Sequence, residues 1–145
     1  MVDVGGKRVT ARVAVARGRV FAHRDTIGLL RDGRTPKGDV LTTAHLAGVM
    51  AAKRTSEFIP LAHPLALDAV DLGFTLEEDS ASIGIEARVR SRGRTGVEME
   101  ALTAVTIAAL TLYDMLKAVD RGMVIGEIAL WEKRGGRSGV YRRRA

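Results

Sequence analysis

The feature that most constrains this 145-residue chain is one long apolar segment whose charges lie only at its two ends. Residues 95–120 have helical spacing, with Glu98 and Glu100 at the entry and Asp114 and Lys117 near the exit. The middle, VTIAALTL, is too apolar to face water, so the helix needs a sheet or another helix to cover it. Glu100 and Lys117 lie roughly 25 Å apart along the axis. If both ends are functional, a second subunit is expected to bring opposite ends together.

The elements around this helix predict the fold class. Four strands and three helices are expected, in the order strand 9–20, helix 23–31, helix 39–58, strand 67–77, strand 82–89, helix 95–120 and strand 124–131. This is the order of the split βαβ, ferredoxin-like fold. We therefore expect an α+β protein with an antiparallel four-stranded sheet and both long helices on one face. The other face must be unusually polar or be covered, and apolar residues on both sides of the hairpin favour coverage by another copy.

Composition restricts the class of protein. The chain has no cysteine, which excludes a disulfide framework, a thiolate nucleophile and a cysteine-bound metal. No apolar run reaches the ~20 residues that span a bilayer and no signal-peptide pattern is seen, so a cytoplasmic protein without a membrane partner is expected. The length predicts one domain over residues 1–145, with a flexible basic tail from about residue 135. The net charge of +6 favours an anionic partner.

The entry of the long helix allows a structural and a chemical interpretation. Thr95 and Glu98 have the spacing of a capping box, in which each side chain binds a backbone N–H group. Glu100 shares one side of the helix with Ile107 and Leu110, which predicts a packed side bordered by carboxylates. Burial raises the pKa of a carboxylate and a neighbouring ammonium lowers it. Carboxylates at the two ends of this side therefore suit separate acid and base roles.

Three other features also have two interpretations. Asp114 and Lys117 can be a simple ion pair three residues apart on a helix. His63, in an apolar loop, can be a structural residue or a proton carrier on a stiffened segment. Lys37 precedes a helix N-terminus, where free N–H groups favour an anion, although no Walker loop is present. The histidines lack the spacing of metal ligands, so no metal site is predicted.

Six segments together resemble one known family. They are KGDV at 37–40, AGVMAAKRT at 47–55, IPLAHPL at 59–65, TGVEMEALT at 95–103, YDMLKAV at 113–119 and MVIG at 123–126. In this order, and over essentially the whole chain, they are similar to the molybdenum-cofactor biosynthesis protein C family, the cyclic pyranopterin monophosphate synthases. The resemblance implies a lyase that converts 3′,8-cyclo-GTP, a nucleotide-derived small molecule, to cyclic pyranopterin monophosphate and releases pyrophosphate.

The resemblance also implies an assembly and a pathway partner. The expected assembly is a hexamer, built as a trimer of dimers, with active sites at the dimer interface. A radical SAM GTP cyclase would supply the substrate. No cofactor is expected to be required, and the resemblance leaves open whether Mg²⁺ accompanies the triphosphate.

The same resemblance implies the site residues. Asp114, Lys117 and Lys37 would be catalytic. The substrate would contact residues of two loops and several cations, namely Leu61, Ala62, His63, Glu98, Met99, Glu100, Lys7, Arg12, Lys53 and Lys133. Opening and rebuilding a guanine-derived ring needs several proton transfers, and expelling pyrophosphate needs cations, so this mixture of residue types fits the reaction.

Two other classes of function compete with this one. An RNA-binding module needs aromatic side chains on the sheet, and the predicted strands offer only Phe74 and Trp131. A ligand-sensing oligomer without catalysis would not explain why so many titratable residues border apolar segments. We therefore prefer the enzyme and expect no nucleic-acid partner.

Overall fold

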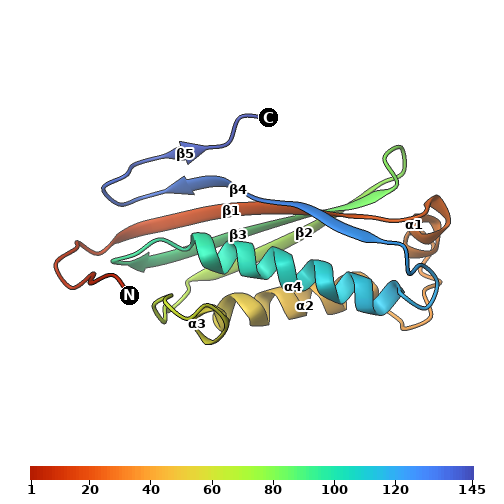
Figure 1. Cartoon of the computed structure of the whole chain (residues 1–145), viewed down its shortest axis with the longest axis horizontal. Helices are drawn as coiled ribbons and strands as arrows, with labels where there is room; N and C mark the ends of the chain where they lie inside the picture. The colour runs from red at the N-terminus through yellow and green to blue at the C-terminus, as the bar shows by residue number, and fades with distance from the viewer.

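The computed structural model describes all 145 residues, and its long helices lie together on one face of one antiparallel sheet (Figure 1). The elements in chain order are β1 (Thr10–Phe21), α1 (Arg24–Arg31), α2 (Val40–Lys53), α3 (Thr55–Phe58), β2 (Ala69–Glu77), β3 (Ser82–Gly93), α4 (Glu98–Leu116), β4 (Val124–Arg134) and β5 (Tyr141–Arg142). The strand order is β2-β3-β1-β4-β5. The predicted α+β, ferredoxin-like class is confirmed, and a short fifth strand extends the expected four.

The two faces of the sheet differ in character because side chains alternate along each strand. On β1, Ala14, Ala16 and Val20 are fully buried under the helices. Arg17 and Arg19 alternate with them on the open face, where they form cross-strand ion pairs. The expectation of apolar residues on both sides of the hairpin is wrong for β2. Its apolar residues pack against the core, whereas Asp71, Gly73 and Thr75 alternate with them.

Small residues bring α2 and α4 close to each other and to the sheet. A Cβ atom at Gly48 of α2 would lie about 3 Å from Leu72 and 3.1 Å from the carbonyl oxygen of Ala104. On α4, Ala104, Ala108 and Leu112 are fully buried. By length and composition α4 is the one helix apolar enough to cross a bilayer. The inner side of α4 packs on the sheet and forms part of the hydrophobic core, so its length and apolar composition are weak evidence for a membrane span.

The N-terminus of α4 corrects the predicted capping box. The helix begins at Glu98 and is preceded by Val97, with no side-chain hydrogen bond that caps it. Glu98 is thus the first helical residue, whereas a capping box places its acidic member at the third. Glu98 still lies where the helix dipole favours a negative charge. The predicted cap at Asp39 is confirmed, because the Thr42 N–H group donates a 3.0 Å hydrogen bond to its carboxylate.

Two other boundaries differ from the prediction. The helix that begins after Asp39 ends at Lys53, and α3 forms a separate turn after Arg54, whose φ and ψ of −115° and 14° interrupt the helix. In the basic tail, β5 pairs with β4, and the Arg143 N–H group donates to the carbonyl of Trp131 at 2.8 Å. The tail therefore continues the sheet by one short edge strand, and its flexibility stays a prediction.

Candidate active site

The exit of α4 holds three charged side chains, Lys37, Asp114 and Lys117, which we call the lysine–aspartate cluster. Lys117 Nζ lies 2.8 Å from one carboxylate oxygen of Asp114. Lys37 Nζ, from the loop between α1 and α2, lies 3.2 Å from the other and also donates to the Asp114 carbonyl at 3.1 Å. All three predicted catalytic residues therefore meet. Asp114 and Lys117 are more than a simple ion pair on one helix, because a third residue from a distant loop completes the group.

The lysine–aspartate cluster fixes its own charge state. Hydrogen bonds from Lys117 and then Lys37 lower the pKa of Asp114, and their positive charges act in the same direction. The hydrogen bond to Asp114 and its negative charge raise the pKa of Lys117. At neutral pH the cluster thus carries a carboxylate beside a protonated Lys117. Each side chain is about half exposed, so the charged groups are available to a ligand.

The entry of α4 holds a hollow of about 490 Å³, which we call the helix-entry hollow. Its wall is formed by the start of the chain, the loop after α3 and the first turn of α4. Most of the predicted substrate-contacting residues line it, namely Leu61, Ala62, His63, Glu98, Met99, Glu100 and Lys7. The structure therefore brings together segments that lie far apart in the sequence, as the resemblance implies.

Glu100 is the distinctive group of the helix-entry hollow. The residue is only 4% exposed. Burial raises the pKa of its carboxyl group, and the nearby charge of Glu98 acts in the same direction. A hydrogen bond from the backbone N–H group of Glu100 opposes this shift. Because no cation of the same chain pairs with it, Glu100 retains a proton more readily than an exposed glutamate does.

A second hollow, of about 680 Å³, adjoins the first, and Lys7 lines both. We call it the basic hollow, because four of its eight residues are cations and none is a carboxylate. Its lining is Gly6, Lys7, Arg8, Thr10, Arg12, Gly136, Arg137 and Ser138. Arg12 is only 8% exposed and has no ion-pair partner in the chain. A buried cation without a counter-charge in its own chain has the capacity to bind an anion.

The remaining two predicted cations lie outside the hollows. Lys133 Nζ donates to the Ser138 hydroxyl and, at 3.5 Å, to the Gly135 carbonyl, so it supports the wall of the basic hollow. Lys53 is an exposed residue at the end of α2 and lines neither hollow. The prediction did not include Arg8, Thr10 or Arg137 among the site residues. For Arg8 and Arg137 the signal in the sequence is their positive charge beside other cations, whereas Thr10 carries no such signal and only the structure places it here.

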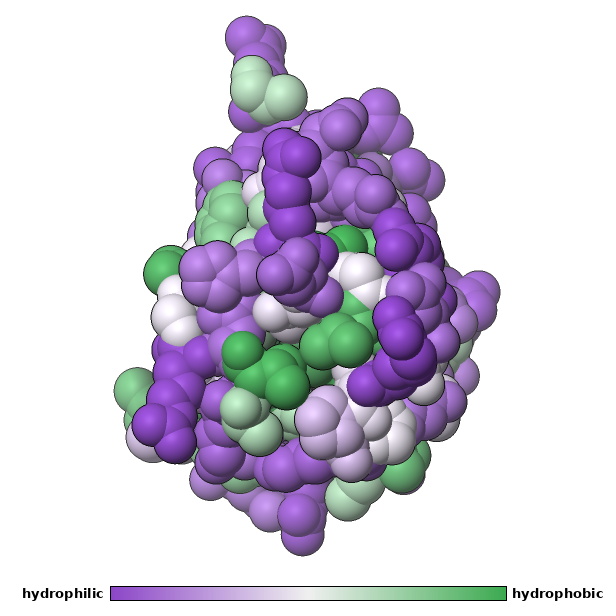
Figure 2. All heavy atoms as spheres, turned by 90° about the vertical axis from the view of Figure 1, so that its right-hand side faces the viewer, coloured by the Kyte–Doolittle hydropathy of each residue, from purple (hydrophilic) through white to green (hydrophobic).

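The two groups of candidate residues lie at opposite ends of the molecule. The hollows are lined by the N-terminal segment and by residues at the start of α4, whereas the lysine–aspartate cluster lies at the exit of α4. The N-terminus and the start of α4 lie at one end of the molecule, and the exit of α4 lies at the other end, near α1 (Figure 1). Seen from the cluster's end, the surface is mainly hydrophilic with a small apolar patch (Figure 2). The predicted packed side between the two ends is wrong for a single chain, because Leu110 is 54% exposed.

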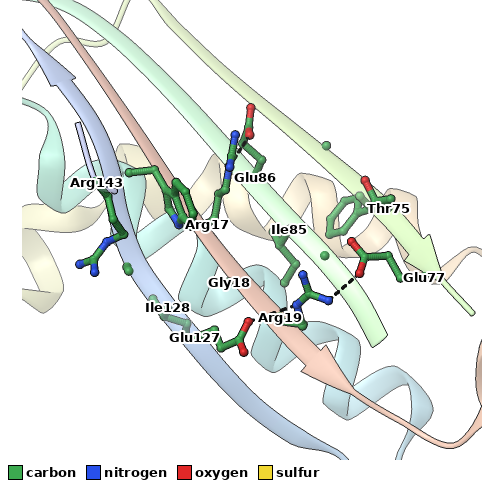
Figure 3. Close-up of a pocket in the computed structure, with 15 residues that line it drawn as sticks. Arg17, Gly18, Arg19, Thr75, Glu77, Ile85, Glu86, Glu127, Ile128 and Arg143 are labelled. Carbon is green, nitrogen blue, oxygen red and sulfur yellow. Dashed lines mark hydrogen bonds and ion pairs between the residues drawn. The ribbon is translucent and has the colours of Figure 1, made fainter. Parts of the chain in front are cut away.

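The open face of the sheet holds a hollow of about 720 Å³, larger than the two at the entry end. Arg19 joins Glu77 and Glu127, and Arg17 joins Glu86 (Figure 3). With Arg143, the lining holds three cations and three carboxylates, so its charges balance, and no predicted site residue lies here. The Arg17 guanidinium covers Trp131, 4.5 Å from the ring centre, while Phe74 packs against the core. The face thus lacks the free aromatic rings that the RNA-binding alternative requires. Elsewhere, no three acidic or histidine side chains come together to form a metal site.

Comparison with known proteins points to one family. Residues 1–136 match the family described as the MoaC family. A cyclic pyranopterin monophosphate synthase of Heliobacterium modesticaldum is 62% identical over 141 residues, which cover 97% of this chain and 89% of that protein. A protein of the same name from Thermomicrobium roseum is 62% identical over 143 residues, with coverage of 99% and 86%. These findings confirm the resemblance seen in the motifs and do not support an RNA-binding module.

Proposed function

This chain belongs to the MoaC family, and from that premise we propose that it converts 3′,8-cyclo-GTP to cyclic pyranopterin monophosphate with release of pyrophosphate. It is thus an enzyme of the lyase type in molybdenum-cofactor biosynthesis. One observation of the structure carries the proposal: two hollows adjoin at Lys7, one lined by unpaired cations and the other by a buried glutamate and a histidine. A purine nucleotide derivative has the two matching parts, a polyanion and a ring that must exchange protons.

The basic hollow is the proposed place for the triphosphate. Arg12 and Lys7 offer positive charge with no carboxylate in the lining to compete. Loss of pyrophosphate places growing negative charge on the phosphate oxygens, and preorganised cations stabilise that charge. The ring then extends into the helix-entry hollow, where His63 and Glu100 can move protons. The raised pKa of Glu100 suits a group that holds a proton more readily than an exposed glutamate and can return it to the substrate.

The lysine–aspartate cluster completes the site from a second subunit in this proposal. Roughly 25 Å of helix separates Glu100 from Lys117, so one substrate does not reach both ends of one chain. The helix layer has exposed aliphatic side chains on its outer side, among them Leu46, Met50 and Leu110. Such residues are typical of a surface that another copy covers. This supports the expected dimer, and the hexamer stays a prediction.

The charge state of the cluster suggests separate roles for its members. Lys117, whose pKa is raised, stays protonated and acts as an acid or as a contact for phosphate oxygens. Asp114 accepts hydrogen bonds from both lysines and orients them. Lys37 is held by the Asp114 carbonyl as well, which aims it from its loop. A radical SAM GTP cyclase would supply the substrate in the cytoplasm.

Turnover is tested directly with 3′,8-cyclo-GTP. We expect the purified chain to release pyrophosphate and form cyclic pyranopterin monophosphate, with and without EDTA if Mg²⁺ is dispensable. Native mass spectrometry of the same sample reports the assembly. A fully active monomer would contradict the shared site. Failure to form product from intact 3′,8-cyclo-GTP would contradict the proposed reaction.

Mixing two inactive variants tests whether the site is shared between chains. Lys117→Ala removes the exit end of one chain, and Glu100→Ala removes the entry end of another. If the two ends meet across a dimer interface, dissociation and random reassembly restore about a quarter of the wild-type activity, because half of the dimers regain one intact site of two. Each variant mixed with itself is the control. No recovery after confirmed subunit exchange would place both ends in separate sites.

A further inference from the structure

Asp120 is a buried carboxylate to which the proposed reaction assigns no role. It lies just after α4, and its side chain is only 1% exposed. No lysine or arginine pairs with it, and the Nε2 atom of His23, 3.7 Å away, belongs to a side chain that is 79% exposed. Removing a carboxylate from water is costly unless hydrogen bonds compensate for the lost water. The partners of Asp120 therefore indicate what this residue does.

Both hydrogen bonds that Asp120 accepts come from the start of α1. Its Oδ2 atom accepts from the His23 N–H group at 2.8 Å and from the buried Thr26 hydroxyl at 2.9 Å. His23 immediately precedes α1, and its own side chain does not cap the helix. Asp120 instead places a negative charge where the helix dipole favours one. It thereby ties the start of α1 to the end of α4, 97 residues away in the chain.

The segment that carries Asp120 is itself fixed on α4. The Asp120 N–H group donates to the Leu116 carbonyl at 3.0 Å. The Tyr113 hydroxyl donates to the Arg121 carbonyl at 2.9 Å and so holds the chain after the helix against the last turn. Asp114, which binds Lys37, lies on the same stretch of chain. Asp114 and Asp120 are therefore held in a fixed relation to each other.

The loop between α1 and α2, which carries Lys37, is folded back on α1 and on itself. The Arg34 N–H group donates to the Leu29 carbonyl at 3.0 Å. The Thr35 hydroxyl donates to the Gly38 carbonyl at 2.6 Å, and Gly38 has a φ of 88°, a region that favours glycine. Because this loop continues directly from α1, a shift of the helix also shifts Lys37.

The segment from α1 to Lys37 is thus held to the end of α4 at two points, and these elements lie at one end of the molecule (Figure 1). Burial of Ile27 keeps α1 on the core but has no direction, whereas hydrogen bonds do. We propose that Asp120 is a positioning residue, which fixes the start of α1 and thereby the place from which Lys37 reaches Asp114. The placement of Lys37 rests on these contacts alone, and its consequence for turnover rests on the proposed function.

Hydrogen exchange of the assembled protein without substrate, measured by mass spectrometry, tests the placement. Asp120→Ala removes the acceptor, whereas Asp120→Asn keeps an oxygen that can accept both hydrogen bonds. We expect Asp120→Ala to speed exchange in residues 32–39 by about tenfold or more, because hydrogen bonds to a charged group are lost. Asp120→Asn should stay within about threefold of wild type. Asp25→Ala, which removes an exposed carboxylate from the first turn of α1, is the matched control and should exchange as wild type does.

Exchange elsewhere in the chain separates this role from a general loss of stability. Thr26→Val removes one of the two hydrogen bonds and keeps the shape of the side chain, so it provides the test if Asp120→Ala does not fold. Its exchange in residues 32–39 should be intermediate. Residues 59–65, at the other end of α4, should keep wild-type exchange in every folded variant. Unchanged exchange in residues 32–39 of the folded variants, or an equal increase in residues 59–65, would overturn the proposal.

Turnover of 3′,8-cyclo-GTP tests the consequence for catalysis. We expect Asp120→Ala to lower kcat by about tenfold with little change in KM, because a displaced catalytic group no longer acts on the substrate. Asp120→Asn should recover most of this loss, and Asp25→Ala should keep wild-type kcat. In a Lys37→Ala background, Asp120→Ala should cause no further loss, since its effect passes through Lys37. A loss by the same factor in both backgrounds would overturn this route.

The two experiments separate the failure of this proposal from the failure of the proposed function. If wild type forms no product, the proposed reaction is wrong, and exchange in residues 32–39 still decides whether Asp120 places Lys37. If wild type forms product but Asp120→Ala keeps both wild-type exchange and wild-type kcat, the reaction stands and the positioning role of Asp120 is wrong.

Discussion

The two ends of α4 place the same functional group in opposite environments. At the entry, Glu100 is buried and no cation of its own chain pairs with it, so the loss of water raises its pKa. At the exit, Asp114 is exposed between two lysines, and their hydrogen bonds and charges lower its pKa. Both residues belong to one helix and one polypeptide. The proton affinity of a carboxylate is therefore set by what the fold packs around it and not by its place on a helix.

The same comparison shows that each end lacks what the other has. The entry end provides two adjoining hollows and a carboxyl group that tends to keep its proton. The exit end provides fixed ammonium groups, and its three members line none of the three hollows described above. A complete site for a phosphorylated ring compound needs both. The four predictions below examine this division, beginning with the largest expected effect.

Removal of either lysine of the exit end should abolish most of the activity. We expect Lys37→Ala and Lys117→Ala to lower kcat for pyrophosphate release by about 10² to 10⁴, the usual contribution of a positioned acid or base. Arg24→Ala, an exposed cation without an ion pair at the start of α1, is the control and should keep wild-type turnover. Near-normal turnover in both lysine variants would show that the exit end has a structural role and no catalytic one.

Asp120 tests whether the exit end depends on a buried carboxylate as the entry end does. This residue follows α4 and is buried, and it accepts hydrogen bonds from the His23 N–H group at 2.8 Å and the Thr26 hydroxyl at 2.9 Å. Asp120→Ala leaves both donors unpaired, so we expect a loss of about 2 kcal/mol in the free energy of unfolding. Urea denaturation measures it, with exposed Asp79→Ala as control. A loss equal to that of Asp79→Ala would contradict the anchoring role.

Glu100→Gln should stabilise the protein at neutral pH, by about 1 kcal/mol. The folded state binds the proton of Glu100 more tightly than the unfolded state does, so the stability of wild type falls as pH rises through the raised pKa. The stability of Glu100→Gln does not fall with pH in this way, so the variant should be more stable than wild type at neutral pH but no more stable in acid. Urea denaturation from pH 4 to 8 measures both curves. A lower stability of the variant at neutral pH would show that a cation of another subunit pairs with Glu100.

Asp114→Asn should give the smallest effect, with the opposite sign. Because folding lowers the pKa of Asp114, its ionised form stabilises the folded state at pH values above the pKa of the unfolded carboxyl group. This contribution is lost as the pH falls through the pKa of the folded state. The variant should be slightly less stable than wild type at neutral pH and equal to it in acid. Because the cluster is exposed, 0.5 M salt should remove most of the difference. A more stable Asp114→Asn variant at neutral pH would contradict a stabilising attraction between Asp114 and the two lysines.

Much of the fold and part of the site follow from local patterns. The order of strands and helices and the cap at Asp39 could be predicted, because periodicity and capping depend on residues within a few positions of one another. The predicted capping box at Thr95 and Glu98 is wrong. The two residues have the right spacing, but the helix begins two residues later than a capping box requires, so Glu98 is its first residue and not its third. The prediction that the side of α4 around Leu110 is packed is wrong for a single chain, in which Leu110 is exposed. The apolar character of a residue does not indicate whether the group that covers it belongs to the same chain or to another.

Local patterns in the sequence are sufficient to predict an α+β chain with helices on one side of a sheet, and its motifs are sufficient to identify the family. The folded structure alone shows that Lys37 contacts Asp114, 77 residues away in the chain, and that the Thr10 hydroxyl has no hydrogen-bond partner. It also decided that Glu100 is buried and Asp114 exposed, which gives their pKa values opposite directions. The physical reason is that local patterns fix backbone conformation, whereas hydrogen-bond partners and access to water depend on residues that only folding brings together.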